Sequence, residues 1–413
     1  MPTTVDPFTH RTGRVAIAAT LLMAAALLAS CTSDDANRAD GGAMSTTTAA
    51  ADPEQVEPFE GPVDEFYRAP DPLPRGAAGD VVRAMEIDAP AGTTGLRIMY
   101  LTTDADDDLR AATGTVYVPE GDAPEGGWPV VAWAHGTSGL AAKCAPSRAP
   151  QPPPGYGIQG VHVAADYLGL GPEGEVHPYL QSVAEGHAVI DSVAAVRSLP
   201  ELAAGDDWVV AGVSQGGHAA LVTNEMAAER LPGATLLGAV AMAPGAELDA
   251  EHGDELQIRI ITTMALVGAA AEDAGIELDR FLSPDVMAAS GAIRDGCVGD
   301  IIDTMLPIAG AADYFLTDPR SDPVGQAWLD ANNPGKVVGA APLLLVQGGK
   351  DLLVLPARTA ALFRRLCGIG QVVEMLDVPE ADHNTVVELS ETEVAAWLQA
   401  RFAGEPPLDD CPT

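Results

Sequence analysis

Short apolar runs alternate with helix-like stretches along most of this chain. The runs have the length and residue types of buried strands, and the stretches between them have the apolar spacing of helices. Strands are expected at Ala111–Val118, Pro129–Ala134, Val161–Ala165, Trp208–Ala211, Leu236–Met242, Ala341–Gln347 and Gln371–Val378. Helices are expected at Ser182–Arg197, Gly217–Glu229, Pro356–Cys367 and Glu391–Arg401. This alternation predicts an α/β fold with a mostly parallel sheet and helices on both faces.

The stretch from about Pro244 to Gly339 breaks the alternation. It is helix-prone, is punctuated by glycine and proline, and contains apolar runs such as Ile260–Val267, but it has no convincing strand. A structureless loop of this length would be improbable inside a compact domain. We therefore expect a helical cap inserted over the sheet edge at about 244–339. Ordinary crossover helices are the alternative.

The N-terminus has the layout of a bacterial export signal. Arg11 and Arg14 precede an uncharged apolar run, Val15–Leu28, that is too short for a comfortable membrane span. Leu28-Ala29-Ser30-Cys31 then resembles a lipobox, in which the cysteine is diacylated and becomes the mature N-terminus. Two acyl chains form a stable membrane anchor. An ordinary secretory peptide with an accidental cysteine is the alternative, and both interpretations predict export.

The N-terminal pattern and the composition after it divide the chain into three expected parts. Residues 1–30 are expected to be a lipoprotein signal peptide. Residues 31–58 are rich in Ser, Thr, Ala, Asp and Gly and are expected to form a flexible tether. Residues 59–413 are expected to hold the folded α/β domain with its cap. The formal net charge of −37 argues against a nucleic-acid partner, because phosphates would be repelled.

The remaining cysteines fit an oxidising compartment. Beyond Cys31 the chain has Cys144, Cys297, Cys367 and Cys411, an even number that predicts two disulfides with three possible pairings. The last two flank the final structural segment, so their pairing would tie down the C-terminal tail. No C-x-x-C spacing occurs, which argues against a metal site, and no cofactor is expected.

The most informative motif is Gly212-Val213-Ser214-Gln215-Gly216. It lies between an apolar strand and a helix-forming run, which is the context of a nucleophile elbow. A strained turn there lifts the serine hydroxyl above the sheet, and the glycines let neighbouring backbone pass. The N–H of Gln215 would lie at the N-terminus of the following helix and point toward a developing oxyanion. An ordinary turn with a surface serine is the alternative.

A serine nucleophile needs a base and an orienting acid. In this type of fold they follow in the order serine, acid, histidine. Asp351 ends a predicted strand in a glycine-rich turn, and His383 lies in a polar loop before the last helix. A turn-capping aspartate and an exposed histidine are the alternatives. His252 precedes Asp351 and is less suitable as the base. Asp382 and Glu380 rank below Asp351, because residues so close to His383 in the sequence rarely orient its ring well.

The loop after an earlier central strand would supply the second oxyanion donor. His135-Gly136-Thr137-Ser138-Gly139 occupies that place, and the N–H of Thr137 or Gly136 is the expected donor. His135 is more typical of a packed structural histidine than of a base. The loop Asp166–Gly171 follows another strand, and it is expected to shape the mouth of the site or to hold the oxyanion loop.

Taken together, these motifs resemble the secretory lipase family of α/β-hydrolases, known from fungi and actinobacteria. The resemblance rests on Gly212–Gly217, His135–Thr137, Cys144–Ser147 and Asp166–Gly171, and it covers about residue 60 to the C-terminus. It implies an α/β-hydrolase fold with a helical cap and a triad of Ser214, Asp351 and His383. It also implies the disulfides Cys144–Cys297 and Cys367–Cys411, and hydrolysis of carboxylic esters, often triacylglycerols. The lipobox departs from the fungal members.

The leading hypothesis is therefore a serine lipase or esterase that acts on an ester or lipid substrate through an acyl-enzyme and is anchored by lipid to the membrane. The stretch Ile258–Val267 would line the acyl cleft or form plain core. An envelope acyltransferase would use the same triad. A binding lipoprotein that retains the fold without catalysis is the alternative from another class, and a peptidase is weaker still.

Overall fold

The computed structural model describes residues 56, 58–248, 256–273 and 275–412. The expected signal peptide, Cys31, most of the expected tether and His252 lie outside these residues. Near the start of the described chain, the Phe59 N–H donates to the carbonyl oxygen of Ala84 in the sheet at 2.7 Å.

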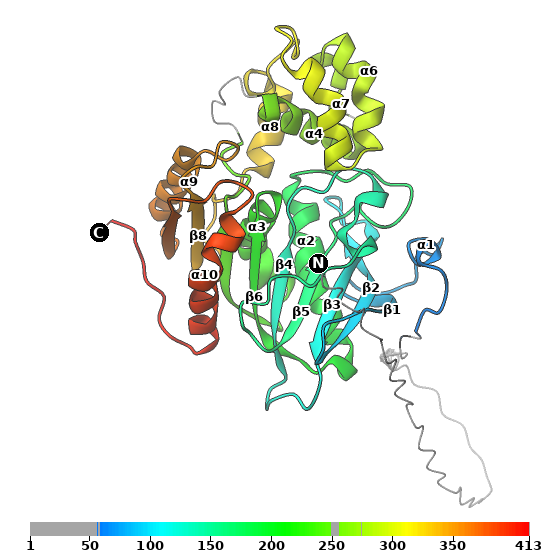
Figure 1. The fold of residues 1–413 in the computed structure, drawn as a ribbon. Coiled ribbons are helices and arrows are strands. Elements are labelled where there is room, and N and C mark those ends of the chain that lie inside the picture. Colours follow the sequence, from blue (N-terminus) through cyan, green and yellow to red (C-terminus); the bar gives the residue numbers. More distant parts are fainter. Residues whose placement is uncertain (1–55, 57, 249–255, 274, 413) are drawn as a thin grey trace, which may run out of the picture. The chain divides into compact units, whose positions relative to one another are not determined.

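A nine-stranded sheet forms the centre of the fold (Figure 1). Its strands are β1 (Val81–Ile87), β2 (Thr93–Thr103), β3 (Leu109–Pro119), β4 (Trp128–Ala134), β5 (Val161–Ala165), β6 (Ala204–Val213), β7 (Thr235–Met242), β8 (Leu343–Gly348) and β9 (Val373–Val378), in the order β1-β2-β3-β5-β4-β6-β7-β8-β9. The pairs β1–β2, β2–β3 and β3–β5 are antiparallel, and the other pairs are parallel. The mostly parallel sheet expected from the sequence is confirmed.

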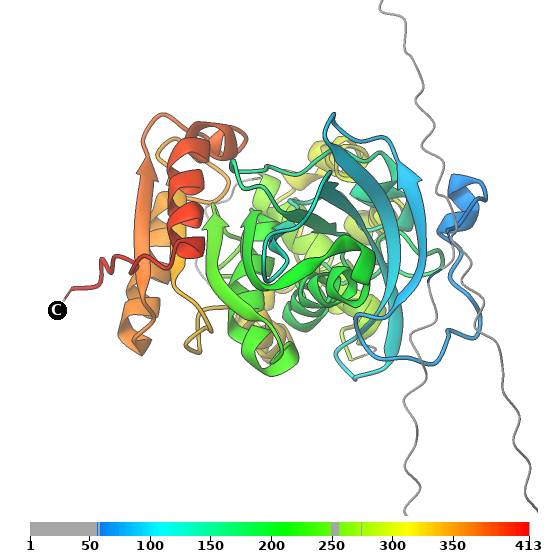
Figure 2. The same cartoon turned by 90° about the horizontal axis from the view of Figure 1, so that it is seen from below.

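Helices cover both faces of this sheet. They are α2 (Ser182–Ser198), α3 (Gln215–Arg230), α9 (Pro356–Ile369) and α10 (Val386–Phe402). Alternate residues of a strand point to opposite faces, and β6 follows this rule. Val210 packs in the core that contains α2, α3 and α9, whereas Val209 and Ala211 pack in the core that contains α10. Figure 2 shows β9, in orange, at one edge of the sheet and the blue antiparallel strands toward the other.

The boundaries of the last elements differ from the expected ones for local reasons. β8 begins at Leu343 rather than Ala341, because Pro342 has no N–H to donate to a strand ladder. β9 begins at Val373 because the N–H of Gln371 is bonded to the carbonyl oxygen of Leu366 at the end of α9. α10 begins at Val386 rather than Glu391, because the backbone carbonyl of Asp382 accepts the N–H of Val386.

The antiparallel strands β1 and β2 were not among the expected strands. β1 is an edge strand of intermediate burial that carries Arg83 and Glu86, so its sequence lacks a continuous apolar run. β2 is mostly buried but contains Gly95 and Arg97, which interrupt its pattern. Their pairing to β3 decides their conformation, because tertiary context overrides weak local propensity.

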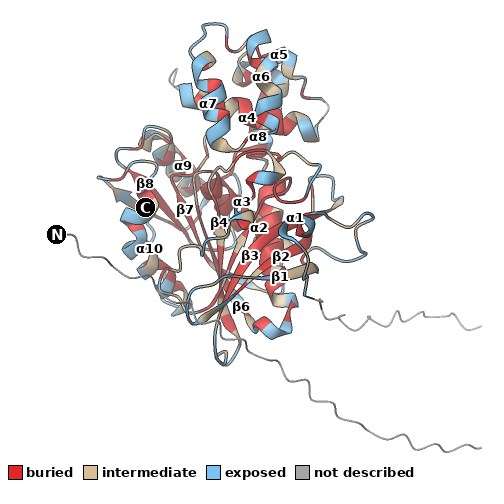
Figure 3. Ribbon diagram, turned by 45° about the vertical axis from the view of Figure 1, so that its right-hand side comes forward, coloured by how far each residue is buried: buried red, intermediate tan, exposed pale blue. Residues whose placement is uncertain are grey.

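In the described part of the segment between β7 and β8, five α-helices form the cap, which Figure 1 draws in yellow-green to yellow. They are α4 (Leu256–Glu272), α5 (Leu278–Phe281), α6 (Pro284–Arg294), α7 (Val298–Ala309) and α8 (Pro323–Asn332). Met264, Phe281 and Met305 of the cap belong to an apolar core that the cap shares with Leu140 and Tyr179 of the sheet domain. The outer face of α7 is exposed (Figure 3). Among the described residues, no helix has the length and apolar character needed to cross a membrane.

Two disulfides link distant parts of the described chain. Cys144, in the loop after β4, is bonded to Cys297 at the start of α7, so the bond joins the sheet domain to the cap. Cys367 in α9 is bonded to Cys411 in the C-terminal tail. These are the pairs that the family resemblance implies.

Reduction of these disulfides is expected to lower the melting temperature. Loops of 153 and 44 residues gain conformational freedom in the unfolded chain when the bonds are cut. In the chain-entropy account each bond contributes about 4–5 kcal/mol of stability. Calorimetry with and without reductant, with thiol titration to show complete reduction, measures the effect. The paired variants Cys144→Ser/Cys297→Ser and Cys367→Ser/Cys411→Ser separate the two bonds. An unchanged melting temperature in fully reduced protein would contradict this expectation.

Candidate active site

Ser214 lies in a strained turn between β6 and α3. Its backbone has φ 58° and ψ −115°, a conformation that residues with a side chain rarely adopt. Gly212 and Gly216 are required because other backbone atoms pass too close to their Cα atoms to leave room for a Cβ. A Cβ on Gly212 would lie 2.1 Å from the carbonyl oxygen of Gly216, and a Cβ on Gly216 would lie 1.9 Å from that of Ala134. The turn therefore has the geometry expected of a nucleophile elbow.

The neighbouring strand β7 fixes this turn from the side. The Ser214 N–H donates to the carbonyl oxygen of Met242 at 2.9 Å, and the N–H of Gly245 donates to the carbonyl oxygen of Ser214 at 2.9 Å. Because both backbone groups of Ser214 are bonded, the strained conformation is held by structure on either side of it.

The structure brings Ser214, His383 and Asp351 together. His383 Nε2 lies 3.0 Å from Ser214 Oγ, and His383 Nδ1 lies 2.8 Å from Asp351 Oδ2. A carboxylate can only accept, so Nδ1 carries the proton and Nε2 can accept from the serine hydroxyl. The carboxylate of Asp351 is fully buried. Its Oδ1 accepts the N–H groups of Leu353 and Val354, both at 2.8 Å.

The other acids near His383 have different partners. Asp382 Oδ1 accepts the N–H groups of Asn384 and Thr385, both at 3.0 Å. Glu380 forms an ion pair with Lys350. These bonds stabilise the loop that carries His383, and neither acid contacts the ring nitrogens in the structure.

The loop expected to supply the second oxyanion donor is held by aromatic side chains. Thr137 Oγ1 lies 2.8 Å from the hydroxyl of Tyr179, and the Tyr167 hydroxyl donates to the carbonyl oxygen of His135 at 2.8 Å. His135 is buried, and burial lowers its pKa, so the ring is neutral near pH 7. Asp166 accepts from Thr113 Oγ1 at 2.5 Å. The Asp166–Gly171 loop therefore supports the loop that carries His135 and Thr137 through the bond from Tyr167.

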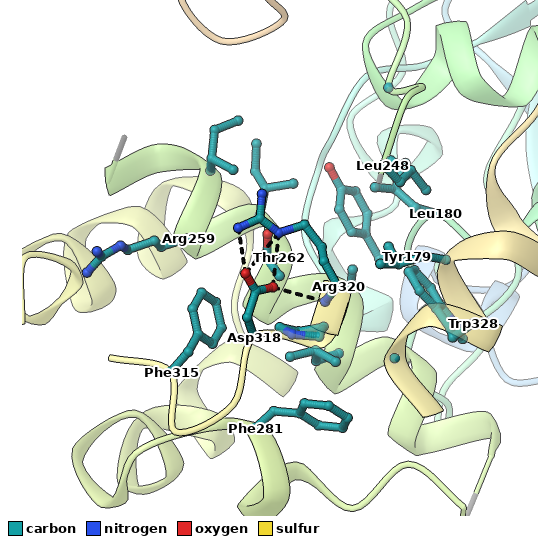
Figure 4. A pocket seen from close by; sticks show the side chains of 18 of the residues that line it. Tyr179, Leu180, Leu248, Arg259, Thr262, Phe281, Phe315, Asp318, Arg320 and Trp328 are labelled. Carbon is teal, nitrogen blue, oxygen red and sulfur yellow. Dashed lines mark hydrogen bonds and ion pairs between the residues drawn. The ribbon is translucent and has the colours of Figure 1, made fainter. Parts of the chain in front are cut away.

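A cavity of about 300 Å³ lies between the cap and Ser214. Its lining is mainly apolar and includes Leu180, Phe281 and Trp328, whereas Asp318 and Arg320 form a hydrogen-bonded ion pair within it (Figure 4). Gln215 also belongs to the lining.

Helix α4 has two apolar faces with different roles. Ile258, Ile261 and Ala265 recur at helical spacing and line the cavity. Ile260 and Met264 pack in the core of the cap. Both interpretations of the stretch Ile258–Val267 therefore apply, and Ala265 has both roles because it also belongs to the core of the cap. Among the described residues, no group of His, Cys, Asp and Glu side chains is arranged to hold a metal ion.

Sequence reasoning missed a buried polar cluster beneath the elbow. It consists of Glu185, Gln215, His177 and His218, all with at most 1% of their surface exposed. His177 Nδ1 donates to the carbonyl oxygen of Leu168 at 2.8 Å, so its Nε2 accepts from the Gln215 amide at 2.6 Å. Burial lowers the pKa of His177 to about 4.

This low pKa predicts a loss of stability in mild acid. Below pH about 6.5 the unfolded chain binds a proton at residue 177, and the folded chain does not bind it until pH about 4. The free energy of unfolding is expected to fall by roughly 3 kcal/mol over this window from His177 alone. Melting temperatures from pH 7 to 4 test this, with a His177→Gln variant expected to give a shallower slope. An equally steep slope in the variant would contradict the assignment.

Comparison with known proteins places this geometry in context. A family model described as "Secretory lipase" matches residues 157–410. No curated protein sequence matches the chain significantly.

Solved structures resemble the whole fold at low sequence identity. Candida antarctica lipase A in its closed state has a TM-score of 0.67 and 17% identity, and the match covers 85% of this chain and 90% of that one. A ligand-bound form of LipA, a rice cell wall degrading esterase from Xanthomonas oryzae, has a TM-score of 0.65 and 18% identity. The match covers 80% of this chain and 100% of LipA. A putative hydrolase from Legionella pneumophila has a TM-score of 0.65 and 20% identity, with 76% and 90% covered. These similarities establish the α/β-hydrolase fold.

Proposed function

Because the chain belongs to the secretory lipase family, we propose that it is an exported serine hydrolase of acylglycerol-type carboxylic esters that uses Ser214, His383 and Asp351. Family membership supports a lipase or esterase that acts on an ester or lipid substrate. The observation that carries the finer assignment is the continuous hydrogen-bonded series from Ser214 Oγ through His383 to Asp351, with Ser214 in the lining of a mainly apolar cavity.

The first half of the reaction transfers the acyl group to the enzyme. His383 Nε2 accepts the proton of Ser214 as Oγ bonds to the ester carbonyl carbon, and the carbonyl π electrons move to the oxygen. The tetrahedral intermediate then collapses, the bond to the alcohol oxygen breaks, and His383 returns the proton to that oxygen. Asp351 stabilises the imidazolium that exists between these steps and keeps the ring in the required tautomer.

Two backbone positions are suited to stabilise the negative oxygen. The N–H of Gln215 is at the first position of α3, where the first N–H groups have no partner within the helix and the helix dipole is positive. The second donor is the N–H of Thr137 or Gly136. Such preorganised donors act in a site with little water, where each is worth far more than in solution.

The second half of the reaction releases the acid. Water gives a proton to His383 Nε2 as its oxygen bonds to the acyl carbon, and the second tetrahedral intermediate expels Ser214, which recovers the proton. The mainly apolar lining of the cavity favours an acyl chain as the group that leaves water there. A carboxylic acid and an alcohol are the products.

The decisive experiment is hydrolysis of p-nitrophenyl esters from acetate to palmitate by the folded protein, with Ser214→Ala as the control. The proposal predicts release of nitrophenol and of free carboxylic acid in wild type, and loss of both in the variant. Supplying glycerol or a sugar tests whether an alcohol competes with water, and an ester product formed in preference to acid would indicate an acyltransferase. Wild-type protein that hydrolyses no member of the series would overturn the proposal.

The N-terminal pattern and family membership support a proposed location for the enzyme. Secretory lipases are exported, and the disulfides fit an oxidising compartment. We place the enzyme at the outer face of the cell membrane, anchored by lipid on Cys31.

Anchoring predicts a clear change on replacement of Cys31. Wild-type protein expressed with its signal peptide in a bacterial host is expected to enter the detergent phase of Triton X-114 and to incorporate labelled palmitate. Cys31→Ser is expected to remain in the aqueous phase without label, because it lacks the acyl chains that hold the protein at the bilayer. Ser214→Ala serves as a control that keeps the anchor. Equal partitioning of wild type and Cys31→Ser would contradict lipidation at this residue.

A further inference from the structure

Glu185 is a fully buried carboxylate in α2 that contacts the residue directly after Ser214. Its Oε1 accepts the side-chain amide of Gln215 at 2.7 Å and the N–H of Leu180 at 3.0 Å. Its Oε2 accepts Nδ1 of His218 at 2.6 Å. A carboxylate removed from water costs several kcal/mol unless it is bonded in this way. Nothing in the proposed chemical steps uses this group.

The proton positions in this cluster follow from the partners. His218 Nδ1 faces the Glu185 carboxylate, and Nε2 lies 2.9 Å from the carbonyl oxygen of Asn332. Both partners are acceptors, so His218 carries both ring protons and forms an ion pair with Glu185. Burial alone would lower the pKa of His218, but the Glu185 carboxylate raises it above its usual value. The amide of Gln215 likewise donates to both Glu185 and His177.

Glu185 reaches both sides of the expected oxyanion site. On one side it holds the side chain of Gln215, whose backbone N–H is the first expected donor. On the other side it holds Leu180, whose neighbour Tyr179 is bonded to Thr137. One buried carboxylate thus fixes the spacing between the two chain segments that would bind the oxyanion.

The same cluster also holds the end of the cap. His218 donates to the carbonyl oxygen of Asn332, the last residue of α8, and the N–H of Ser182 donates to Asn332 Oδ1 at 2.8 Å. Asn332 Nδ2 donates to the carbonyl oxygen of Trp328, which lines the cavity. A continuous set of hydrogen bonds therefore runs from the cavity wall to the turn that carries Ser214.

We propose that Glu185 is a positioning residue for ester hydrolysis. Through Gln215 and Leu180 it sets the distance between the two oxyanion donors, and through His218 it fixes the position of α8 relative to these donors. This inference rests on the proposed function. Its kinetic signature is a fall in kcat with little change in KM, because an oxyanion exists only in the transition state and in the tetrahedral intermediates. A displacement of about 1 Å at such a site costs on the order of 100-fold in rate.

The experiment compares Glu185→Ala, Glu185→Gln and a matched control, Asp191→Ala, on p-nitrophenyl butyrate. Asp191 is also a buried carboxylate of α2, but it accepts from Thr102 and Arg230 and has no part in the cluster. Glu185→Ala is expected to lower kcat roughly 100-fold and to weaken inhibition by an alkylboronic acid, a tetrahedral mimic, by a similar factor. Asp191→Ala is expected to lower the melting temperature while kcat stays within about threefold of wild type, because a group outside the site acts on stability rather than on the transition state.

Glu185→Gln is the rescue variant. Its amide oxygen can still accept from Gln215 and Leu180, and its NH₂ group can donate to a neutral His218 that keeps its bond to Asn332. We expect it to restore kcat to within about tenfold of wild type, since the geometry at the oxyanion site is kept.

Gln215→Met provides a second route if Glu185→Ala does not fold. It keeps the backbone N–H of residue 215 but removes the bond to Glu185, and it is expected to lower kcat and boronic acid binding together. Unchanged kcat in folded Glu185→Ala or Gln215→Met, beside a wild type that depends on Ser214, would overturn the inference and leave the proposed function intact. A wild type without esterase activity would instead overturn the proposed function.

Discussion

Replacing Ser214 with alanine is expected to lower kcat for ester hydrolysis by about 10⁵- to 10⁶-fold. The substitution removes the atom that would form the acyl-enzyme and leaves His383 with no hydroxyl at 3.0 Å. The residual rate would come from the oxyanion donors and from binding alone, which together give about 10³- to 10⁴-fold over water. Alanine should fit the turn, because Ser214 makes its backbone bonds to Met242 and Gly245 without its side chain.

The measurement uses purified, folded protein and p-nitrophenyl butyrate. Ser390→Ala is the matched control, since Ser390 is a buried serine that bonds to the carbonyl oxygen of Val386 within its own helix. It should retain nearly full activity. An organophosphate should label wild type once, on the peptide that contains residue 214. Activity above about 1% in Ser214→Ala, with label on another residue, would remove Ser214 from the mechanism.

Replacing Asp351 with asparagine is expected to lower kcat by about 10⁴-fold while the fold is retained. The amide oxygen can take over the bonds from Leu353 and Val354, so the turn after β8 persists. The amide NH₂ group would then face His383 Nδ1 and make this nitrogen an acceptor. The ring proton would move to Nε2, and the ring could no longer accept the proton of Ser214.

The neighbouring acid provides the comparison for this variant. Asp382→Asn alters a carboxylate one residue from His383 that bonds to the loop backbone rather than to the ring. Its kcat should stay within about threefold of wild type, because the ring keeps its tautomer and its partner. Measuring activity against pH in both variants reports the protonation state of His383. A larger loss in Asp382→Asn than in Asp351→Asn would transfer the orienting role to Asp382.

Residues with a local physical reason for their identity could be predicted from the sequence. Backbone contacts within and beside the turn require glycine at positions 212 and 216. The apolar strands before them predict a buried parallel sheet. Chain order then selected Asp351 and His383, which the structure places in line with Ser214. These inferences needed only neighbours in the sequence and a known order of elements.

The polar cluster could not be predicted in the same way. Glu185 is separated by 30 residues from Gln215 and by 33 residues from His218, and no local spacing connects them. One signal was present: Glu185 and Asp191 are the two carboxylates of a helix that consists mainly of small and apolar residues, and buried carboxylates almost always have partners. The strands β1 and β2 were missed for a related reason, because their pairing to β3 rather than their own pattern determines them.

The cap is joined to the sheet domain by bonds that differ in permanence. The Cys144–Cys297 bond is covalent and breaks only on reduction, whereas the hydrogen bonds at Asn332 can break and reform without any chemical step. The C-terminal end of α8 can therefore separate from His218 and Ser182 while the N-terminal end of α7 stays joined to the sheet domain.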